Sequence, residues 1–123
     1  MAFPTRQRIR RPAEFRRVFA RGRRTSGSYA NIAVLANDLA FSRFGLSVSK
    51  RVGTAVTRNQ VKRRMRHVLA DMNIADGWDV VVTAKPQSSG VSYAMLGETI
   101  QRLFKRLGIP VAATDIYCAG AIE

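Results

Sequence analysis

The residues with the clearest chemistry in this chain are cations that recur through positions 58–66. Counted at about 100° per residue of a helix, they fall on one side together with an amide: Arg58, Asn59, Lys62, Arg63 and Arg66. The adjoining arc is apolar, as in a helix packed on a core, and carries Val61, Met65, Val68, Leu69 and Met72. Like charges three or four residues apart cost about 0.3 kcal/mol per pair, and no Glu relieves them. We therefore predict a helix that binds a polyanion, with a solvated charged surface as the plain alternative.

No group of side chains in the sequence has the spacing of a catalytic or metal site. Nuclease chemistry by a protein needs carboxylates clustered around a divalent metal, or a pair of histidines. The eight Asp and Glu residues show no ligand spacing, and His67 and Cys118 are the sole histidine and cysteine. The turn at 50–53 lacks the spacing of a Walker loop. The sequence therefore predicts no catalytic residue and no metal ligand in the protein itself.

The overall charge also indicates a polyanionic partner. The 123 residues include 21 Lys and Arg against 8 Asp and Glu, a net charge of +13, and a compact fold with that imbalance repels itself unless an anion relieves it. Nucleic acid is the first expectation and a membrane surface the second. No segment approaches the roughly 18 apolar residues of a spanning helix, and no apolar signal region follows the basic N-terminus. We expect one domain over residues 1–123, in the cytoplasm and without a membrane partner.

Periodicity and end signals predict a small α+β fold. The expected helices are 12–22, 57–72 and 92–107, with Thr57 and Ser92 as N-caps. The expected strands are 29–36, 44–49 and 78–85, and residues 23–27 read as a basic, turn-rich connection. The last two strands flank a helix, which predicts a parallel βαβ crossover. We predict a mostly antiparallel sheet of about four strands packed with three helices.

Two aromatic residues lie on the first predicted helix. Phe15 and Phe19 share one side of it with Val18. This spacing fits core anchors. It also fits stacking platforms for an unpaired nucleic-acid strand, because basic residues surround the pair: Arg16, Arg17 and Arg21. The spacing alone does not decide between the two.

The strand at 44–49 alternates between large and small residues. Phe44, Leu46 and Val48 form an apolar face, whereas Gly45, Ser47 and Ser49 form a small, polar one. An open face without bulky side chains suits the floor of a groove, although an ordinary solvated sheet face has the same pattern.

The cationic series resembles the signature of a known family. The pattern Arg51-x-Gly53-x-Ala55-Val56-x-Arg58-Asn59-x-x-Lys62-Arg63-x-x-Arg66 is similar to that of the bacterial ribonuclease P protein, the small partner of the catalytic RNA that trims tRNA precursors. The resemblance extends over residues 8–107, with departures at Gln60 and His67. It implies a single RNA-binding domain in a ribonucleoprotein that removes the 5′ leader of precursor tRNA. It also implies that RNA supplies the chemistry, with Mg²⁺ held mainly by the RNA and the substrate.

The resemblance assigns residues to two RNA partners, with one protein expected per catalytic RNA. It implies that the catalytic RNA is bound by Lys50, Arg51, Arg58, Asn59, Lys62, Arg63 and Arg66. We expect the precursor's leader in a cleft between the first helix and the open sheet face, bound by Phe15, Phe19, Arg16, Tyr29, Ser47 and Ser49. The family also implies a left-handed βαβ crossover, against the general right-handed rule.

Two other classes of function fit parts of the pattern. A structural or ribosomal RNA-binding protein would show the same charge and the same sheet and helices, but not the long signature together with the Phe15 and Phe19 pair. A DNA-binding helix would need a dimer interface or helix-turn-helix spacing, and neither is evident.

We also expect a basic arm at 1–11 that orders only against its partner, and a C-terminal tail at 111–123 whose place the sequence does not assign.

Overall fold

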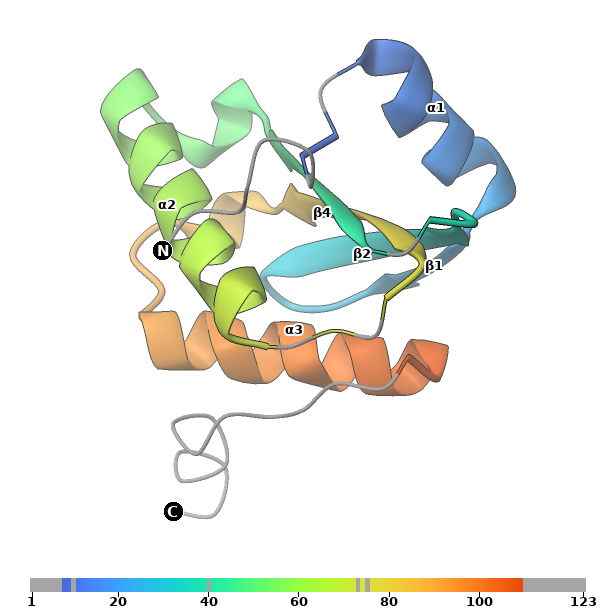
Figure 1. The fold of residues 1–123 in the computed structure, drawn as a ribbon. Coiled ribbons are helices and arrows are strands. Elements are labelled where there is room, and N and C mark those ends of the chain that lie inside the picture. Colours follow the sequence, from blue (N-terminus) through green and yellow to red (C-terminus); the bar gives the residue numbers. More distant parts are fainter. Residues whose placement is uncertain (1–7, 10, 40, 73, 75, 110–123) are drawn as a thin grey trace.

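The centre of the fold is a four-stranded sheet (Figure 1). The computed structural model describes residues 8–9, 11–39, 41–72, 74 and 76–109. The strands are β1 (Arg23–Ser26), β2 (Ala30–Ala36), β3 (Arg43–Val48) and β4 (Trp78–Ala84), in the order β1-β2-β4-β3. The pairs β1–β2 and β2–β4 are antiparallel, whereas β3–β4 is parallel. This confirms the predicted α+β class and the mostly antiparallel sheet.

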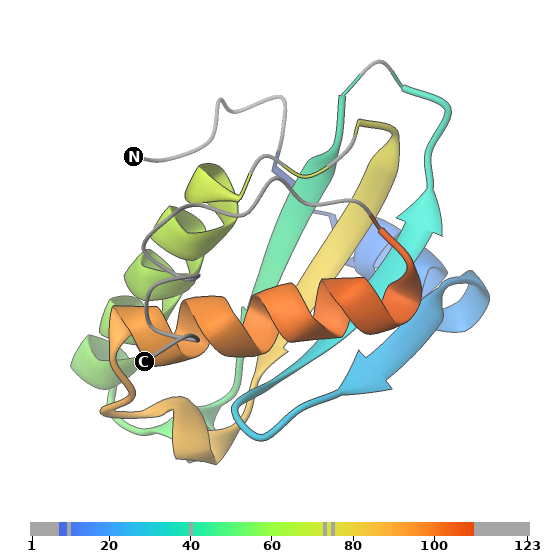
Figure 2. The same cartoon turned by 90° about the horizontal axis from the view of Figure 1, so that it is seen from below.

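Three helices cover the two faces of the sheet. They are α1 (Pro12–Arg21), α2 (Ala55–Asp71) and α3 (Tyr93–Leu107), with short 3-10 turns at Lys50–Val52 and Pro86–Ser88. One face of the sheet is covered by α1, and we call it the α1 face; α2 and α3 cover the opposite face (Figures 1 and 2).

Ser92 caps α3 as predicted, its side chain accepting a hydrogen bond from the backbone N–H of Met95. The predicted cap of α2 is wrong: Thr54 is the N-cap and accepts from the N–H of Thr57, so the helix begins two residues earlier.

The core is divided by the sheet into two clusters. Val80 and Val82 of β4 pack with α2 and α3, while Val81 between them packs with Val18 of α1. All three valines of β4 are fully buried, because side chains alternate across a strand and both faces of this one are covered. Helix α1 therefore packs on one face of β4, and α2 and α3 pack on the other.

The connection from β3 through α2 to β4 is left-handed, as the family resemblance implies. Figure 2 shows the sheet from the side of α2 and α3, with β3 and β4 running down the picture and β4 to the right of β3. The chain passes from β3 to β4 through α2, which lies on the viewer's side. A crossover that moves to the right in this view has the rare left hand.

Two parts of the chain differ from the sequence-based expectation. Residues 23–27 were expected to be a turn-rich connection, but Arg23–Ser26 form the edge strand β1. Ile9, within the predicted arm, is 5% exposed and donates its N–H to the carbonyl of Phe44 at 2.8 Å. Most of the arm and the tail at 111–123 lie outside the described residues.

Candidate nucleic-acid interfaces

The residues predicted to bind the catalytic RNA lie together on the turn Lys50–Val52 and on α2. We call them the cationic face: Lys50, Arg51, Arg58, Asn59, Lys62, Arg63 and Arg66. Val52 is 5% exposed and anchors the turn, and Gly53 then reverses the chain with a φ of 150°, a value that favours glycine. The cap at Thr54 fixes where the helix begins. Val52, Gly53 and Thr54 therefore fix the turn and the start of the helix, which carry the cationic face.

The cationic face is available to an external anion. The apolar stripe on the other side of α2 is confirmed, since all five of its predicted members are 0–2% exposed. None of the ion pairs found among the described residues involves a cation of the face. No acidic residue lies in the first turn of α2, so the positive end of the helix dipole adds to the cations. Arg64, outside the face, instead donates to the carbonyl of Val91 at 3.1 Å.

A row of small polar side chains crosses all four strands on the α1 face. The strand register pairs Ser26 with Asn31, Asn31 with Thr83, and Thr83 with Ser47. We call these four residues the polar row. Ser26 Oγ donates to Asn31 Oδ1 at 2.6 Å and accepts from Lys85 Nζ at 2.9 Å. Residues directly opposite on one face are neighbours, so the row is a continuous polar floor.

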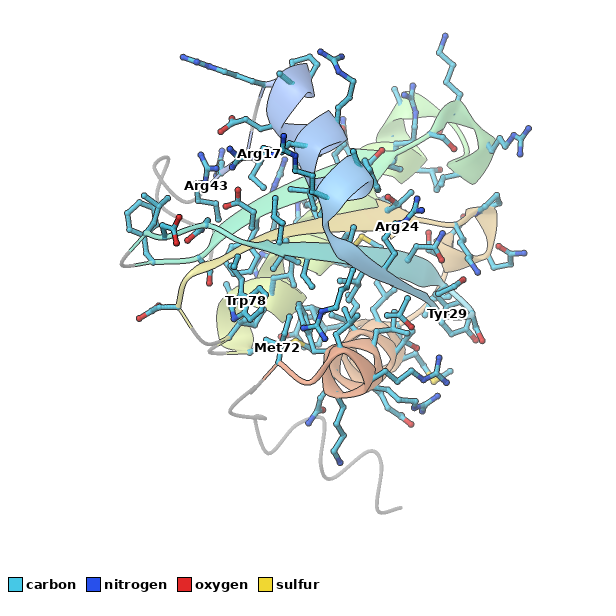
Figure 3. The ribbon with its side chains drawn as sticks, turned by 90° about the vertical axis from the view of Figure 1, so that its right-hand side faces the viewer. Arg17, Arg24, Tyr29, Arg43, Met72 and Trp78 are labelled. Atoms are coloured by element: carbon cyan, nitrogen blue, oxygen red, sulfur yellow. The ribbon has the colours of Figure 1, made fainter. Side chains whose placement is uncertain are left out.

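The polar row forms the floor of a pocket of about 450 Å³ beside α1. We call it the sheet pocket, and its lining is Phe19, Arg24, Thr25, Ser26, Asn31, Ile32, Ala33, Ser47 and Thr83. Phe19 is half-buried against the core cluster under α1 and also lines the pocket. Figure 3 shows Arg24 on the α1 side of the sheet. An aromatic wall, a cation and hydroxyl and amide groups together can hold a base and its phosphate.

Phe15 has a different position from Phe19. It packs in the same core cluster, but it lies over the neighbouring row of the sheet: a Cβ built on Gly45 would stand 2.7 Å from Phe15 Cζ. Gly45 therefore has no room for a side chain, and the ring of Phe15 covers this part of the sheet next to the pocket. Both aromatic residues therefore pack on the core cluster under α1, and Phe19 also lines the sheet pocket.

Three other residues predicted to contact the leader do not line the sheet pocket. Tyr29 packs against the core cluster of α2 and α3, and Figure 3 shows it near α3. Ser49 follows β3, and its backbone carbonyl accepts a hydrogen bond from the N–H of Val52 at 3.1 Å. Arg16 is exposed on α1.

Sequence reasoning missed three residues that line the sheet pocket: Arg24, Asn31 and Thr83. For Asn31 in β2 and Thr83 in β4, the visible signal was a polar residue between apolar neighbours.

A partly buried ionic network, centred on the buried Asp79, holds the N-terminal half of α1 on the sheet. The Asp79 side chain is 0% exposed, and its carboxylate accepts from Arg43 Nε and Nη2 at 2.9 and 2.7 Å. It also accepts from Asn37 Nδ2 at 2.9 Å and from Arg17 Nη2 of α1 at 3.3 Å. Arg43 Nη1 donates to Glu14 Oε2 of α1 at 2.6 Å. Figure 3 shows Arg17 and Arg43 side by side.

The network keeps Asp79 ionised. Burial alone would raise the pKa of Asp79, but the hydrogen bonds from Arg43 and Asn37 and the charge of Arg43 outweigh it, and the pKa lies below the usual value. The hydrogen bond to Asp79 likewise raises the pKa of Arg43. Since Glu14 and Arg17 flank Phe15 on α1, the network fixes the helix that carries Phe19 and so the wall of the sheet pocket.

The described residues contain no group of three or more His, Cys, Asp or Glu side chains that could hold a metal ion. In the same part of the chain, no helix is both long and apolar enough to cross a bilayer. The cationic face and the sheet pocket present cationic, aromatic and hydrogen-bonding groups, which are the kinds of group that bind phosphates and bases.

Comparison with known proteins gives one family. The family model described as Ribonuclease P matches residues 3–108. The ribonuclease P protein component of Clostridioides difficile is 32% identical over 90% of this chain and 100% of its own, and that of Clostridium kluyveri is 36% identical over 83% and 95%. The structure of the Thermotoga maritima RNase P protein has a TM-score of 0.73 at 28% identity, covering 80% of this chain and 96% of its own. The Staphylococcus aureus RNase P protein has a TM-score of 0.75 over 84% and 96%, and its 24% identity supports the fold alone.

Proposed function

Because the chain belongs to the ribonuclease P protein family, it is the protein subunit of the ribonucleoprotein that processes tRNA 5′ ends, and we propose how its surfaces divide that work. The cationic face binds the catalytic RNA. The sheet pocket binds the single-stranded leader of the precursor tRNA. The chemistry of cleavage is assigned to the catalytic RNA.

The assignment of the catalytic RNA to the cationic face rests on unpaired charge. Among the described residues, no carboxylate forms an ion pair with a cation of the face. The face consists of Lys50, Arg51, Arg58, Asn59, Lys62, Arg63 and Arg66. A folded RNA offers closely spaced phosphates, and each cation that neutralises one releases counterions.

The assignment of the leader rests on the polar row beside Phe19. A single strand without fixed sequence needs a stacking surface and a cationic path more than it needs base-specific contacts. Phe19 supplies the stacking surface and Arg24 the cation. Hydrogen-bonding groups under the RNA strand come from Asn31, Thr83 and Ser47. Arg16 extends the cationic path along α1, and Phe15 keeps the wall in place. Tyr29 and Ser49 are not included, because they lie outside the pocket.

The remaining parts of the proposal come from the family resemblance and from the sequence. The holoenzyme works with one protein and one catalytic RNA in the cytoplasm, and it takes precursor tRNA as substrate. Mg²⁺ is held mainly by the RNA and the substrate, as the family resemblance implies. The protein contributes by lowering the electrostatic cost of bringing two polyanions together.

Reconstitution tests the proposed function. The protein is mixed with the ribonuclease P RNA subunit and a precursor tRNA at low Mg²⁺, where we expect cleavage at the mature 5′ end to be stimulated. The protein alone should not cleave. Cleavage by RNA-free protein that persists through nuclease treatment, or a lack of stimulation by folded protein, would contradict the proposal.

A further inference from the structure

A second cationic pocket lies on the other side of the β1–β2 turn from the sheet pocket. Its volume is about 300 Å³, and it is lined by Ser26, Gly27, Ser28, Thr99, Arg102, Leu103 and Arg106. We call it the α3 pocket. Ser26 lines both pockets, so the two adjoin around the end of the edge strand β1. None of the residues lining the α3 pocket is acidic.

Ser26 presents a different group on each side. Its side chain belongs to the polar row and contacts Asn31 and Lys85. Its carbonyl accepts from Arg106 Nη1 at 3.2 Å. The guanidinium of Arg106 is therefore held beside the turn, where its other N–H groups remain for a further acceptor.

The turn is held firmly against α3. Gly27 donates its N–H to the carbonyl of Ala30 at 2.9 Å, which closes the turn. A Cβ on Gly27 would stand 3.2 Å from both terminal methyl groups of Leu103, so the turn packs closely on the helix. This packing fixes the position of the α3 pocket relative to the sheet pocket, as a binding path that spans both requires.

Two guanidinium groups converge on the α3 pocket from one side of α3. Arg102 and Arg106 are four residues apart, a spacing that brings side chains together and costs stability when both are cations. Arg102 also pairs with Glu98 through Nη2 at 2.8 Å, with 58% and 34% of the two side chains exposed. An exposed pair of this kind is weak and leaves the other N–H groups of Arg102 for a phosphate. The hydroxyl groups of Ser28 and Thr99 also line the pocket.

We propose that the leader does not end in the sheet pocket but continues around the β1–β2 turn, and that a phosphate of its distal part binds Arg102 and Arg106 in the α3 pocket. This inference rests on the proposed function of the sheet pocket. Continuity through Ser26 favours the leader over the catalytic RNA, because neither pocket is lined by a residue of α2. The protein would then bind long leaders more tightly than short ones without reading their sequence.

The test uses the reconstituted holoenzyme and precursors whose leaders lengthen one nucleotide at a time. With the unchanged protein we expect affinity to rise in two steps, the first as the leader fills the sheet pocket and the second as it reaches the α3 pocket. Arg102→Gln with Arg106→Gln should abolish only the second step, a loss of about tenfold that is confined to long leaders. The dependence of long-leader affinity on salt should also become shallower, by about one to two units of log–log slope.

Controls separate the outcomes. Lys105→Gln removes an exposed cation from the same helix outside either pocket and should leave both steps intact. Thermal unfolding of the variants checks that the fold survives. Equal weakening at every leader length, or weaker binding of the catalytic RNA, would overturn the proposal by assigning the arginines to the catalytic RNA. Two intact steps in the folded double variant would overturn it as well. Loss of the first step is a separate result, because it concerns the sheet pocket and the proposed function.

Discussion

The cationic face and the sheet pocket are built in opposite ways. The cationic face comes from one turn and one helix, and its side chains are set by spacing within a single stretch of sequence. The sheet pocket takes residues from α1 and all four strands, and its floor exists only because three strand pairings put Ser26, Asn31, Thr83 and Ser47 in one row. Binding at the face should therefore depend on charge, and binding at the pocket on the position of α1 over the sheet.

The largest expected effect comes from breaking the network that holds α1. Asp79→Asn leaves Arg43, which is 18% exposed, without its buried carboxylate, and loss of one partner from a buried pair costs about 3–5 kcal/mol of unfolding free energy. Chemical denaturation measures this loss. The matched control is Glu98→Gln, which breaks an exposed pair on α3 and should cost about 0.5 kcal/mol or less. Similar losses in the two variants would show that the network does not position α1.

The next effect concerns the cationic face. Arg58→Ala with Lys62→Ala should weaken binding of the catalytic RNA by about 3 kcal/mol and lower the log–log salt slope by about two units, because two phosphate contacts are lost. Titration at several salt concentrations measures both quantities. Arg11→Ala with Lys105→Ala removes the same charge from exposed positions off the face. If that control weakens binding equally, net charge and not the face controls the interaction.

Much of the helical structure could be predicted from sequence, since its signals are local. The stripe of α2 and the cap of α3 follow from spacing and from one Ser. The cap of α2 was misassigned because Thr54 and Thr57 both have the right chemistry, and the reversal at Gly53 decides between them. The strand β1 was missed because an edge strand of polar residues has no apolar alternation, and pairing with β2 alone defines it.

The candidate site was predicted only in part, for the same physical reason. The cationic face could be assigned from the spacing of Arg58, Lys62 and Arg66 and from the family signature. In the sheet pocket, Phe19 and Ser47 could be predicted, but Arg24, Asn31 and Thr83 depend on strand register. Register is a long-range property that a single sequence specifies weakly. Tyr29 was chosen for its side-chain type, and its place in the other core cluster depends on packing with α2 and α3.

A moderate effect is expected from the wall of the sheet pocket. Phe19→Ala should weaken holoenzyme binding of precursor tRNA by about 1–3 kcal/mol, the usual contribution of one stacked base. Phe19→Tyr keeps the aromatic ring and should retain most of the affinity. Phe15→Ala serves as the structural control, because it opens a gap over Gly45 and should lower the unfolding temperature more than Phe19→Ala does. A large loss of stability in Phe19→Ala without selective loss of precursor would return Phe19 to the core alone.

The smallest effect is expected from acid. Because the folded pKa of Asp79 lies below its unfolded value, this residue stabilises the fold above a pH of about 4 and loses that contribution as the pH falls through the folded pKa. Denaturation between neutral pH and pH of about 3 should show stability falling only at the acid end. Asp79→Asn should remove this part of the pH dependence. An unchanged acid transition in that variant would assign the transition to other carboxylates.

The most direct test of two separate surfaces measures two affinities in two variants. Binding of the catalytic RNA, and the preference of the assembled holoenzyme for precursor over mature tRNA, are compared in Arg58→Ala with Lys62→Ala and in Phe19→Ala. We predict that the first variant loses affinity for the catalytic RNA but keeps the preference for precursor once enough protein is added to assemble it. We predict that Phe19→Ala assembles normally and loses the preference. Equal loss of both properties in both variants would contradict the division of labour between the cationic face and the sheet pocket.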